Sequence, residues 1–295
     1  MSGRRLAVNP ISYWLKGGKT VATLGAAFDE LSAIGYTAVK ADVPTDLDAA
    51  SYVGWLAGYG LEPALSLFPG SWADASRHAE VARAAGEYAA QQASLGMTVC
   101  MVSTTEPRDH ARQVHPAVGA DFDAGRLATV VDGIGATCEA MRAEGVLAAL
   151  HPHVGGWVET EEEVRAVLDG VGPDLLAFGP DTGHLAWAGA DVVGVLRDHS
   201  SRIVGCHLKD VFAEGVERAR REDLSYQDAT LPGSLWAEPG TGSVDLDACV
   251  AAFPPDYDGD FMIEVDVPSV PDRECHEIAH RWAVEHLPLG EVAHR

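Results

Sequence analysis

Four short apolar segments in the second half of the chain are each followed by side chains that can bind a metal ion or carry a proton. In chain order, these segments are ALHPHVGG with His151 and His153, GPDTGH with Asp181 and His184, CHLKD with His207 and Lys209, and MIEVDVP with Glu264 and Asp266. Imidazole and carboxylate groups bind divalent cations and act as general acids or bases. A single histidine at a strand end is usually a buried structural residue, but four consecutive segments with this pattern indicate a common site.

Asp181, His207 and Glu264 combine two carboxylates with one imidazole. This mixed oxygen and nitrogen set suits Mn²⁺, Mg²⁺, Fe²⁺ or Co²⁺ better than it suits a thiolate-ligated ion. Residues two apart on a strand point to the same side, so His207 and Lys209 share a face, whereas Asp210 points away and is expected to be structural. We therefore expect Lys209 to act beside a metal ligand, the alternative being a solvated lysine at the start of a loop.

The elements that must position these residues alternate along the whole chain. Short apolar runs predict strands at residues 6–8, 38–41, 62–67, 98–102, 146–150, 175–178, 203–206 and 261–265. Longer segments with helical periodicity predict helices at residues 20–33, 48–58, 72–95, 123–143, 160–170, 189–199, 245–253 and 271–286. Eight strand-then-helix units predict one closed (β/α)8 barrel, in which functional residues collect at the carboxyl ends of the strands.

An open doubly wound sheet is the alternative fold, but it needs about six strands and a glycine-rich phosphate turn after the first, which NPISYWLKGGK does not supply. No Ser/Pro-rich linker or low-complexity segment divides residues 1–295, so the sequence predicts a single domain. The longest irregular stretch, near residues 212–245, follows a strand and is expected to be an active-site loop or lid.

Composition and charge argue against several classes of partner. Of the 295 residues, 47% are hydrophobic, which is enough for a substantial core. The 44 acidic residues against 21 basic residues give a formal net charge of −23, which argues against nucleic acid or an anionic membrane surface as a partner. Five cysteines without Cys-x-x-Cys spacing, and the lack of a signal-peptide core or membrane-spanning stretch, favour a reducing, cytoplasmic location.

Aromatic and polar side chains near other strand ends suggest what the site binds. Five of the seven tryptophans fall on predicted loops, where indole faces suit the apolar face of a sugar, a cyclitol or an aromatic aglycone: Trp14, Trp72, Trp157, Trp187 and Trp236. Each could equally plug the top of the barrel. Lys40 and Asp42 could bind the hydroxyls of a neutral polyol or pair with each other. The lack of an arginine cluster or glycine-rich anion cradle at the strand ends disfavours a phosphorylated substrate.

Four segments carry a resemblance to a known family: HPHVGGWVET, DTGHLAWAG, HLKDV and IEVDVP. In this order they resemble segments of the xylose isomerase-like TIM-barrel superfamily, the sugar phosphate isomerase/epimerase group, and most closely its inosose dehydratase branch. The resemblance implies a TIM barrel that binds one divalent metal ion, often Mn²⁺, at the ends of strands five to eight. By position, the implied ligands are His151, Asp181, His207 and Glu264. It also implies that the chain could form a homo-oligomer.

One residue departs from the pattern of the sugar isomerases and epimerases of this superfamily, which usually have a glutamate where this chain has His151. An epimerase that works with two carboxylates needs one on each face of the substrate, one to remove a proton and one to return a proton. Replacing one carboxylate with an imidazole unbalances that pair of proton transfers. A lyase instead removes a proton beside a carbonyl, through a metal-stabilised enediolate, and protonates a departing hydroxyl. We therefore expect a metal-dependent dehydratase acting on a keto-cyclitol or keto-sugar, with the catalytic residues Glu264, His153, His184 and Lys209.

The general acid is expected to be His184 or whichever of His151 and His153 does not bind metal, because imidazole titrates near neutral pH. Two other reactions stay open: sugar isomerisation or epimerisation, and elimination of the aglycone from a 3-keto-glycoside. A barrel that binds a sugar without turnover is the alternative from another class, although such a protein has no need of Glu264 or additional histidines beside a metal.

Overall fold

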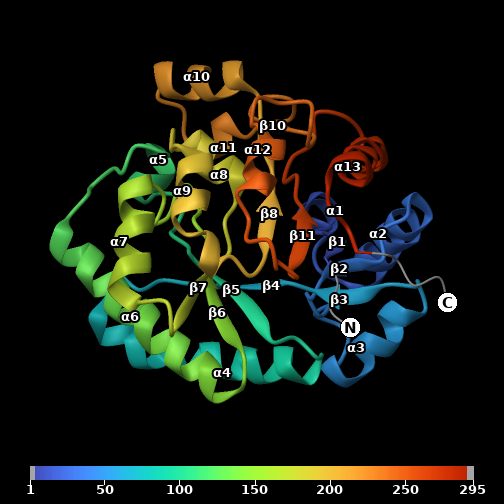
Figure 1. Ribbon diagram of the computed structural model, residues 1–295, viewed down its shortest axis with the longest axis horizontal. Coiled ribbons are helices and arrows are strands. Elements are labelled where there is room, and N and C mark those ends of the chain that lie inside the picture. Colours follow the sequence, from blue (N-terminus) through green and yellow to red (C-terminus); the bar gives the residue numbers. More distant parts are fainter. Residues whose placement is uncertain (1–3, 291–295) are drawn as a thin grey trace.

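The computed structural model describes residues 4–290 (Figure 1). The strands of its barrel are β1 (Arg5–Val8), β2 (Ala38–Lys40), β3 (Glu62–Ala64), β4 (Ser66–Gly70), β5 (Val99–Thr104), β6 (Leu147–Leu150), β7 (Leu176–Phe178), β8 (Cys206–Leu208) and β11 (Asp260–Ile263). Parallel pairing orders them as β3-β2-β1-β11-β8 and β4-β5-β6-β7. β4 directly continues β3, and bridges from Phe178 to Ile203 and from Asp181 to His207 join β7 to the β8 segment. The strands therefore close into the predicted (β/α)8 barrel.

Helices surround the barrel, and most of them begin at a side chain that caps free backbone N–H groups. They are α1 (Ile11–Gly17), α2 (Val21–Ile34), α3 (Ala49–Ala57), α4 (His78–Ser94), α5 (Ala111–Val114), α6 (Ala124–Ala143), α7 (Glu161–Val171), α8 (Thr182–Trp187), α9 (Val192–Asp198), α10 (Ala213–Arg221), α11 (Tyr226–Ala229), α12 (Leu246–Ala251) and α13 (Asp272–His286). Thr20, Asp48 and Asp123 accept hydrogen bonds from the first turns of α2, α3 and α6. Each predicted helix overlaps one of these elements. Within residues 4–290, none of the helices combines the length and the apolar composition needed to cross a membrane.

Two apolar clusters lie on opposite sides of the strands. The interior of the barrel holds Ala7, Ala38, Ala64, Leu65, Met101 and Met262. A larger cluster, which includes Val8, Val39 and Phe261, packs between the strands and the helices. Because successive strand residues face opposite sides, the interior cluster identifies which residues of each strand point into the barrel.

Two strand predictions differ from the structure. The predicted strand at residues 62–67 is two strands, because the backbone N–H of Leu65 bonds to Asp260 Oδ2 (2.9 Å) instead of a neighbouring strand. The predicted strand at residues 203–206 begins only at Cys206, where pairing with Phe261 of β11 starts. His207 therefore lies within β8 and does not follow it.

Residues 210–245 form an excursion between β8 and α12, and they are not irregular as expected. β9 (Asp210–Val211) pairs antiparallel with β10 (Trp236–Ala237), and α10 and α11 lie between these two strands in the chain. α10 stands at the edge of the molecule, above α11 and β10 in the view of Figure 1. Asp210 has the expected structural role, because its carboxylate accepts hydrogen bonds from the backbone N–H groups of Val211, Gly240, Gly242 and Val244.

Candidate metal centre and active site

A layer of polar residues lies above the interior apolar cluster. The strand residues that face the barrel interior include Ala7, Ala38, Met101, Ala149, Gly179, Gly205 and Met262. In each strand segment, the residue two positions further along the chain faces the same way. The inward polar residues are more than nine-tenths buried: Asn9, Lys40, Ser103, His151, Asp181, His207 and Glu264. The barrel therefore presents a ring of polar side chains at its carboxyl end, the location predicted for the site.

His151, Asp181 and His207 bring three potential ligand atoms together, as the sequence analysis predicted. Asp181 Oδ2 lies 3.8 Å from His151 Nε2 and 3.8 Å from His207 Nδ1. Ligand atoms bound at about 2.0–2.2 Å to one ion lie roughly 3–4 Å from each other. The three buried side chains therefore have the spacing that a divalent cation requires.

None of these three ligand atoms has a hydrogen-bond partner among the described residues. Asp181 caps α8 through Oδ1, which accepts the backbone N–H of His184 (2.8 Å), and Oδ2 is left without a hydrogen bond, 3.6 Å from the Lys209 ammonium. Nδ1 of His151 lies 3.1 Å from the carbonyl oxygen of Gly179, so Nδ1 carries the proton and Nε2 presents its lone pair. Buried polar atoms without partners are rare and costly, and here they fit a metal ion.

Glu264, the fourth implied ligand, lies directly beside this cluster. Its Oε2 is 2.8 Å from His207 Nδ1 without hydrogen-bond geometry, a contact that suits two ligands of one ion. Oε2 also accepts from Asn9 Nδ2 (2.6 Å), and Oε1 accepts from Lys209 Nζ (2.8 Å). Burial alone would raise the pKa of Glu264, but His207 and Lys209 hold that pKa well below its usual value. A carboxylate held in this way is better suited to bind a cation than to accept a proton.

Lys209 is fully buried, so the alternative of a solvated lysine is wrong. Its ammonium lies 2.8 Å from Glu264, 3.2 Å from Asp266 and 3.6 Å from Asp181. Burial would lower the pKa of Lys209, but these three carboxylates raise it well above its usual value. The ammonium also lies 4.6 Å from the ring centre of Trp236. Lys209 is thus a fixed positive charge beside the metal ligands.

His153 and His184 form a closely packed pair beside the cluster, with ring centres 3.8 Å apart and ring planes tilted by 37°. Nδ1 of His153 lies 2.7 Å from the carbonyl oxygen of Val154, so Nδ1 donates and Nε2 presents a lone pair. Nδ1 of His184 accepts the backbone N–H of Val154 (3.2 Å), so the neutral ring carries its proton on Nε2, which lies 3.4 Å from Lys209 Nζ. The two rings therefore hold complementary tautomers: His153 presents a lone pair, and His184 presents an N–H group that can donate a hydrogen bond.

The protonation state of this pair corrects the sequence analysis. Burial lowers the pKa of His153 to about 4, and burial together with His153 places the pKa of His184 well below its usual value. Both rings are neutral near pH 7 in the free protein. The expectation of a histidine that titrates near neutral pH is therefore wrong for this pair, because His184 is buried, His153 is partly buried, and desolvation disfavours the charged form of each ring.

Lys40 and Asp42 pair with each other at the end of β2, one of the two expectations for them. Lys40 Nζ lies 3.3 Å from Asp42 Oδ2, and Lys19 Nζ lies 2.9 Å from the same oxygen. The Lys19 ammonium in turn lies 4.4 Å from the ring centre of Trp14. Burial would lower the pKa of Lys40, but Asp42 and Glu264 raise it, so the side chain is an ammonium that faces the polar ring.

The predicted tryptophans separate into two groups. Trp187 and Trp236 contact the site, since their ring centres lie 6.4 Å and 5.0 Å from that of His184. Trp72 is a core residue, and its expected place at the rim is wrong: it is fully buried and donates its indole N–H to Thr137 Oγ1 (2.8 Å). Trp157 is also misplaced by the sequence analysis, because its ring packs against the guanidinium groups of Arg112 and Arg126.

Three residues of the site were missed by the sequence analysis. Asn9 and Ser103 end the first and fourth barrel strands, and they could have been found by extending the period-two rule to LAVNP and CMVST. Tyr226 of α11 lies over the histidine pair, with ring centres 5.9 Å from His153 and 5.1 Å from Trp187. No local pattern identifies Tyr226, because a distant excursion brings it to the barrel.

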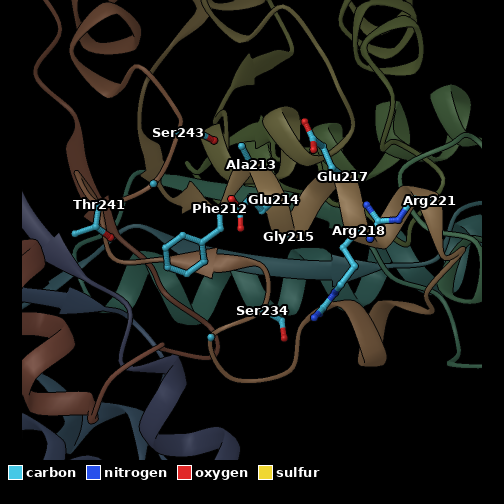
Figure 2. Close-up of a pocket in the computed structure, with 12 residues that line it drawn as sticks. Phe212, Ala213, Glu214, Gly215, Glu217, Arg218, Arg221, Ser234, Thr241 and Ser243 are labelled. Atoms are coloured by element: carbon cyan, nitrogen blue, oxygen red, sulfur yellow. The ribbon is translucent and has the colours of Figure 1, made fainter.

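The cavity of about 830 Å³ beside α10 lies elsewhere and has none of the candidate ligands in its lining. Figure 2 shows Glu217, Arg218 and Arg221 projecting from α10, with Ser234 and Thr241 on the segments opposite. Its volume exceeds that of many ligand sites, but it is open, and the partnerless buried atom in its lining is Arg218 Nε, a donor that cannot bind a metal ion. The barrel end is therefore the stronger candidate for chemistry.

Comparisons with known proteins agree with this fold. The family described as xylose isomerase-like TIM barrel matches residues 28–286. An inosose dehydratase of Geobacillus kaustophilus (strain HTA426) is 28% identical over 269 residues, which cover 89% of this chain and 87% of that relative.

Two solved structures share the architecture at low sequence identity. The probable 3-DHS dehydratase AsbF from Bacillus anthracis has a TM-score of 0.71 at 14% identity, covering 95% of this chain and 98% of that one. The IOLI protein with a bound zinc atom has a TM-score of 0.69 at 15% identity, covering 95% and 97%. At these identities the likeness concerns the fold. Because the family match spans most of the barrel, the chain belongs to the xylose isomerase-like TIM-barrel family.

Proposed function

We propose that this protein is a divalent-metal-dependent lyase that eliminates water from a keto-cyclitol or keto-sugar. The observation that carries the proposal is the buried cluster of His151, Asp181 and His207, whose ligand atoms lack partners, beside two histidines held in complementary tautomers. The similarity to an inosose dehydratase over 89% of the chain supports the same reaction class. The substrate would be a small neutral polyol with a carbonyl group.

The residues that would hold the ion are His151, Asp181 and His207, with Glu264 as the fourth ligand. When bound, the ion supplies polarisation of the substrate carbonyl, which acidifies the neighbouring C–H. The nitrogen and carboxylate ligands suit Mn²⁺, and Mg²⁺, Co²⁺ or Fe²⁺ also fit this ligand set. The zinc atom in the IOLI structure belongs to that protein and leaves the identity of the ion here to be measured.

The side chains beside the ligands would handle the protons. Nε2 of His153 accepts the proton from the carbon next to the carbonyl, because its lone pair is free. The imidazolium that forms on His153 then protonates the departing hydroxyl, and the C–O bond breaks as the C=C bond forms. The products are water and an enone, and His153 returns to its neutral form. His184, whose ring centre lies 3.8 Å from that of His153, donates a hydrogen bond to the substrate hydroxyl through Nε2–H. Lys209 stabilises negative charge that develops on the substrate oxygen.

Burial of the site supports this role, because proton transfers of this kind need water to be excluded. Tyr226, Trp187 and Trp236 enclose the two histidines. We infer that the excursion at residues 210–245 acts as a lid over the barrel. The two tryptophans would also suit an aromatic aglycone, so elimination from a 3-keto-glycoside is the second candidate. All five cysteines are buried and unpaired, which suits a reducing compartment such as the cytoplasm.

The test is turnover of an inosose by protein stripped of metal and reloaded with Mn²⁺. We expect an enone absorbance that grows with time in the loaded protein and disappears in chelator. Ketohexoses and 3-keto-glycosides, assayed in parallel, define the substrate class. Formation of an epimer without enone would replace the lyase assignment with an epimerase, and unchanged activity after complete metal removal would refute the metal dependence.

A further inference from the structure

The polar ring at the barrel end has two chemically different halves. The segments of β6, β7, β8 and β11 contribute the candidate metal ligands, whereas those of β1, β2 and β5 contribute Asn9, Lys40 and Ser103. Asn9 and Ser103 are 1% and 3% exposed, and Asn9 Oδ1 and Ser103 Oγ have no hydrogen-bond partner among the described residues. Buried polar atoms without partners do not help a protein to fold, so a ligand is the physical reason to keep them.

We propose that Asn9, Lys40 and Ser103 form a hydroxyl-binding arc that holds the face of a polyhydroxylated ring remote from its carbonyl group. This inference rests on the proposed function for the identity of the reacting carbonyl. The arc itself stands on separate residues, which neither bind the ion nor transfer the substrate proton.

Each member of the arc offers a different hydrogen-bonding group. Asn9 donates through Nδ2 to Glu264 Oε2, which fixes the amide so that Oδ1 can accept from a substrate hydroxyl. Lys40 contacts Asp42 through Nζ, and an ammonium carries three donors, so further donors are available to substrate oxygens. Ser103 can donate and accept. A vicinal polyol, in which every hydroxyl is both donor and acceptor, matches this set.

The placement of the arc also fits a single ring lying across the barrel end. Asn9 follows Val8, which pairs with Val39, so Asn9 and Lys40 lie on neighbouring strands at the same level. Ser103 lies beside His151, whose backbone N–H bonds to the carbonyl oxygen of Val102 (2.9 Å). The arc therefore continues directly into the ligand cluster on both sides, through Glu264 next to Asn9 and His151 next to Ser103.

Charge favours a neutral ligand at this arc over a phosphate. Asp42 lies within 3.3 Å of both lysines on this side, Lys19 and Lys40, and neutralises part of their charge. Glu264, a carboxylate, lies on the other side of Asn9. A dianionic group placed here would meet these two carboxylates as well as the ammonium groups, whereas hydroxyls bind to all of them.

The decisive variant is Ser103→Ala, which removes only the partnerless hydroxyl. Thr104→Val is the matched control, because Thr104 is the next residue on β5 and its Oγ1 accepts the backbone N–H of Val158 (3.3 Å). Binding of myo-inositol, a cyclitol with no carbonyl, is measured calorimetrically on the full chain loaded with Mn²⁺. Thermal unfolding of the metal-free proteins is measured in parallel.

We expect Ser103→Ala to bind myo-inositol about tenfold more weakly than the unmodified protein while unfolding at the same or a higher temperature. Thr104→Val should show the opposite pattern, with normal binding and reduced stability. No binding of myo-inositol by the unmodified protein, or equal affinity in Ser103→Ala, would overturn the arc.

The outcome is separable from that of the proposed function. Enone formation from an inosose with an unchanged KM in Ser103→Ala would leave the lyase standing and refute the arc. Weakened myo-inositol binding in Ser103→Ala, combined with no elimination from any keto-substrate, would leave the arc standing and refute the lyase.

Discussion

Replacing Lys209 with Met tests whether this buried lysine compensates the carboxylates of the site. Methionine has nearly the same length and no charge, so the change removes the ammonium and preserves most of the packing. The ammonium lies 2.8 Å from Glu264, 3.2 Å from Asp266 and 3.6 Å from Asp181, and it is fully buried. Without it, three buried carboxylates lose their nearest cation.

Removing one partner of a buried ion pair usually costs about 3–5 kcal/mol, because an uncompensated charge stays in the interior. In a protein of this size, 1 kcal/mol corresponds to roughly 2–4 °C in the unfolding temperature. We therefore expect metal-free Lys209→Met to unfold on the order of 10 °C below the unmodified protein. A divalent ion bound beside Asp181 and Glu264 would replace the missing positive charge, so Mn²⁺ should raise the unfolding temperature of the variant more than that of the unmodified protein.

The assay is differential scanning calorimetry in chelator and in Mn²⁺. Lys16→Met is the control, because Lys16 pairs with Asp272 at the surface (2.6 Å) and its loss changes the net charge equally. The control should unfold close to the unmodified protein. If metal-free Lys209→Met also unfolds within 2–3 °C of it, as roughly 1 kcal/mol would allow, the buried charge compensation described here is incorrect.

The His151→Gln variant should lose metal and activity together, whereas His153→Gln should keep the metal and turn over about 10²–10⁴-fold more slowly. Metal analysis and rate measurements distinguish the two variants. Near-normal turnover in both variants would contradict the mechanism. Burial lowers the pKa of His276 to about 4, and neither ring nitrogen has a partner among the described residues. The unfolded chain therefore binds more protons below pH 6.5, so stability should be complete above pH 7 and fall by about 3 kcal/mol as the pH drops to 4. His276→Phe should weaken this pH dependence in urea titrations, and an unchanged slope would exclude His276 as its source. Asp210→Ala leaves four backbone N–H groups without their acceptor, so proteolysis within residues 212–245 should accelerate, and equal cleavage rates would show that the excursion is held by other contacts.

The repeating strand-and-helix pattern was predictable because it depends on local periodicity. Apolar runs and capping residues such as Thr20 and Asp48 specify elements without reference to the rest of the chain. The same local rule placed His151, Asp181, His207 and Glu264 at strand ends, and the closed barrel then required these ends to meet. Boundaries were less predictable: the interruption at Leu65 depends on Asp260, almost two hundred residues away in the chain.

The sequence by itself determined the barrel and the chemical types of the residues at its carboxyl end, because alternation and strand order follow from local pattern. Only the tertiary structure decided how those residues act. Burial made His153 and His184 neutral, three carboxylates kept Lys209 charged, and contacts with Thr137 removed Trp72 from the rim. Desolvation and charge pairing depend on groups from distant strands, and they appear only when the chain is folded.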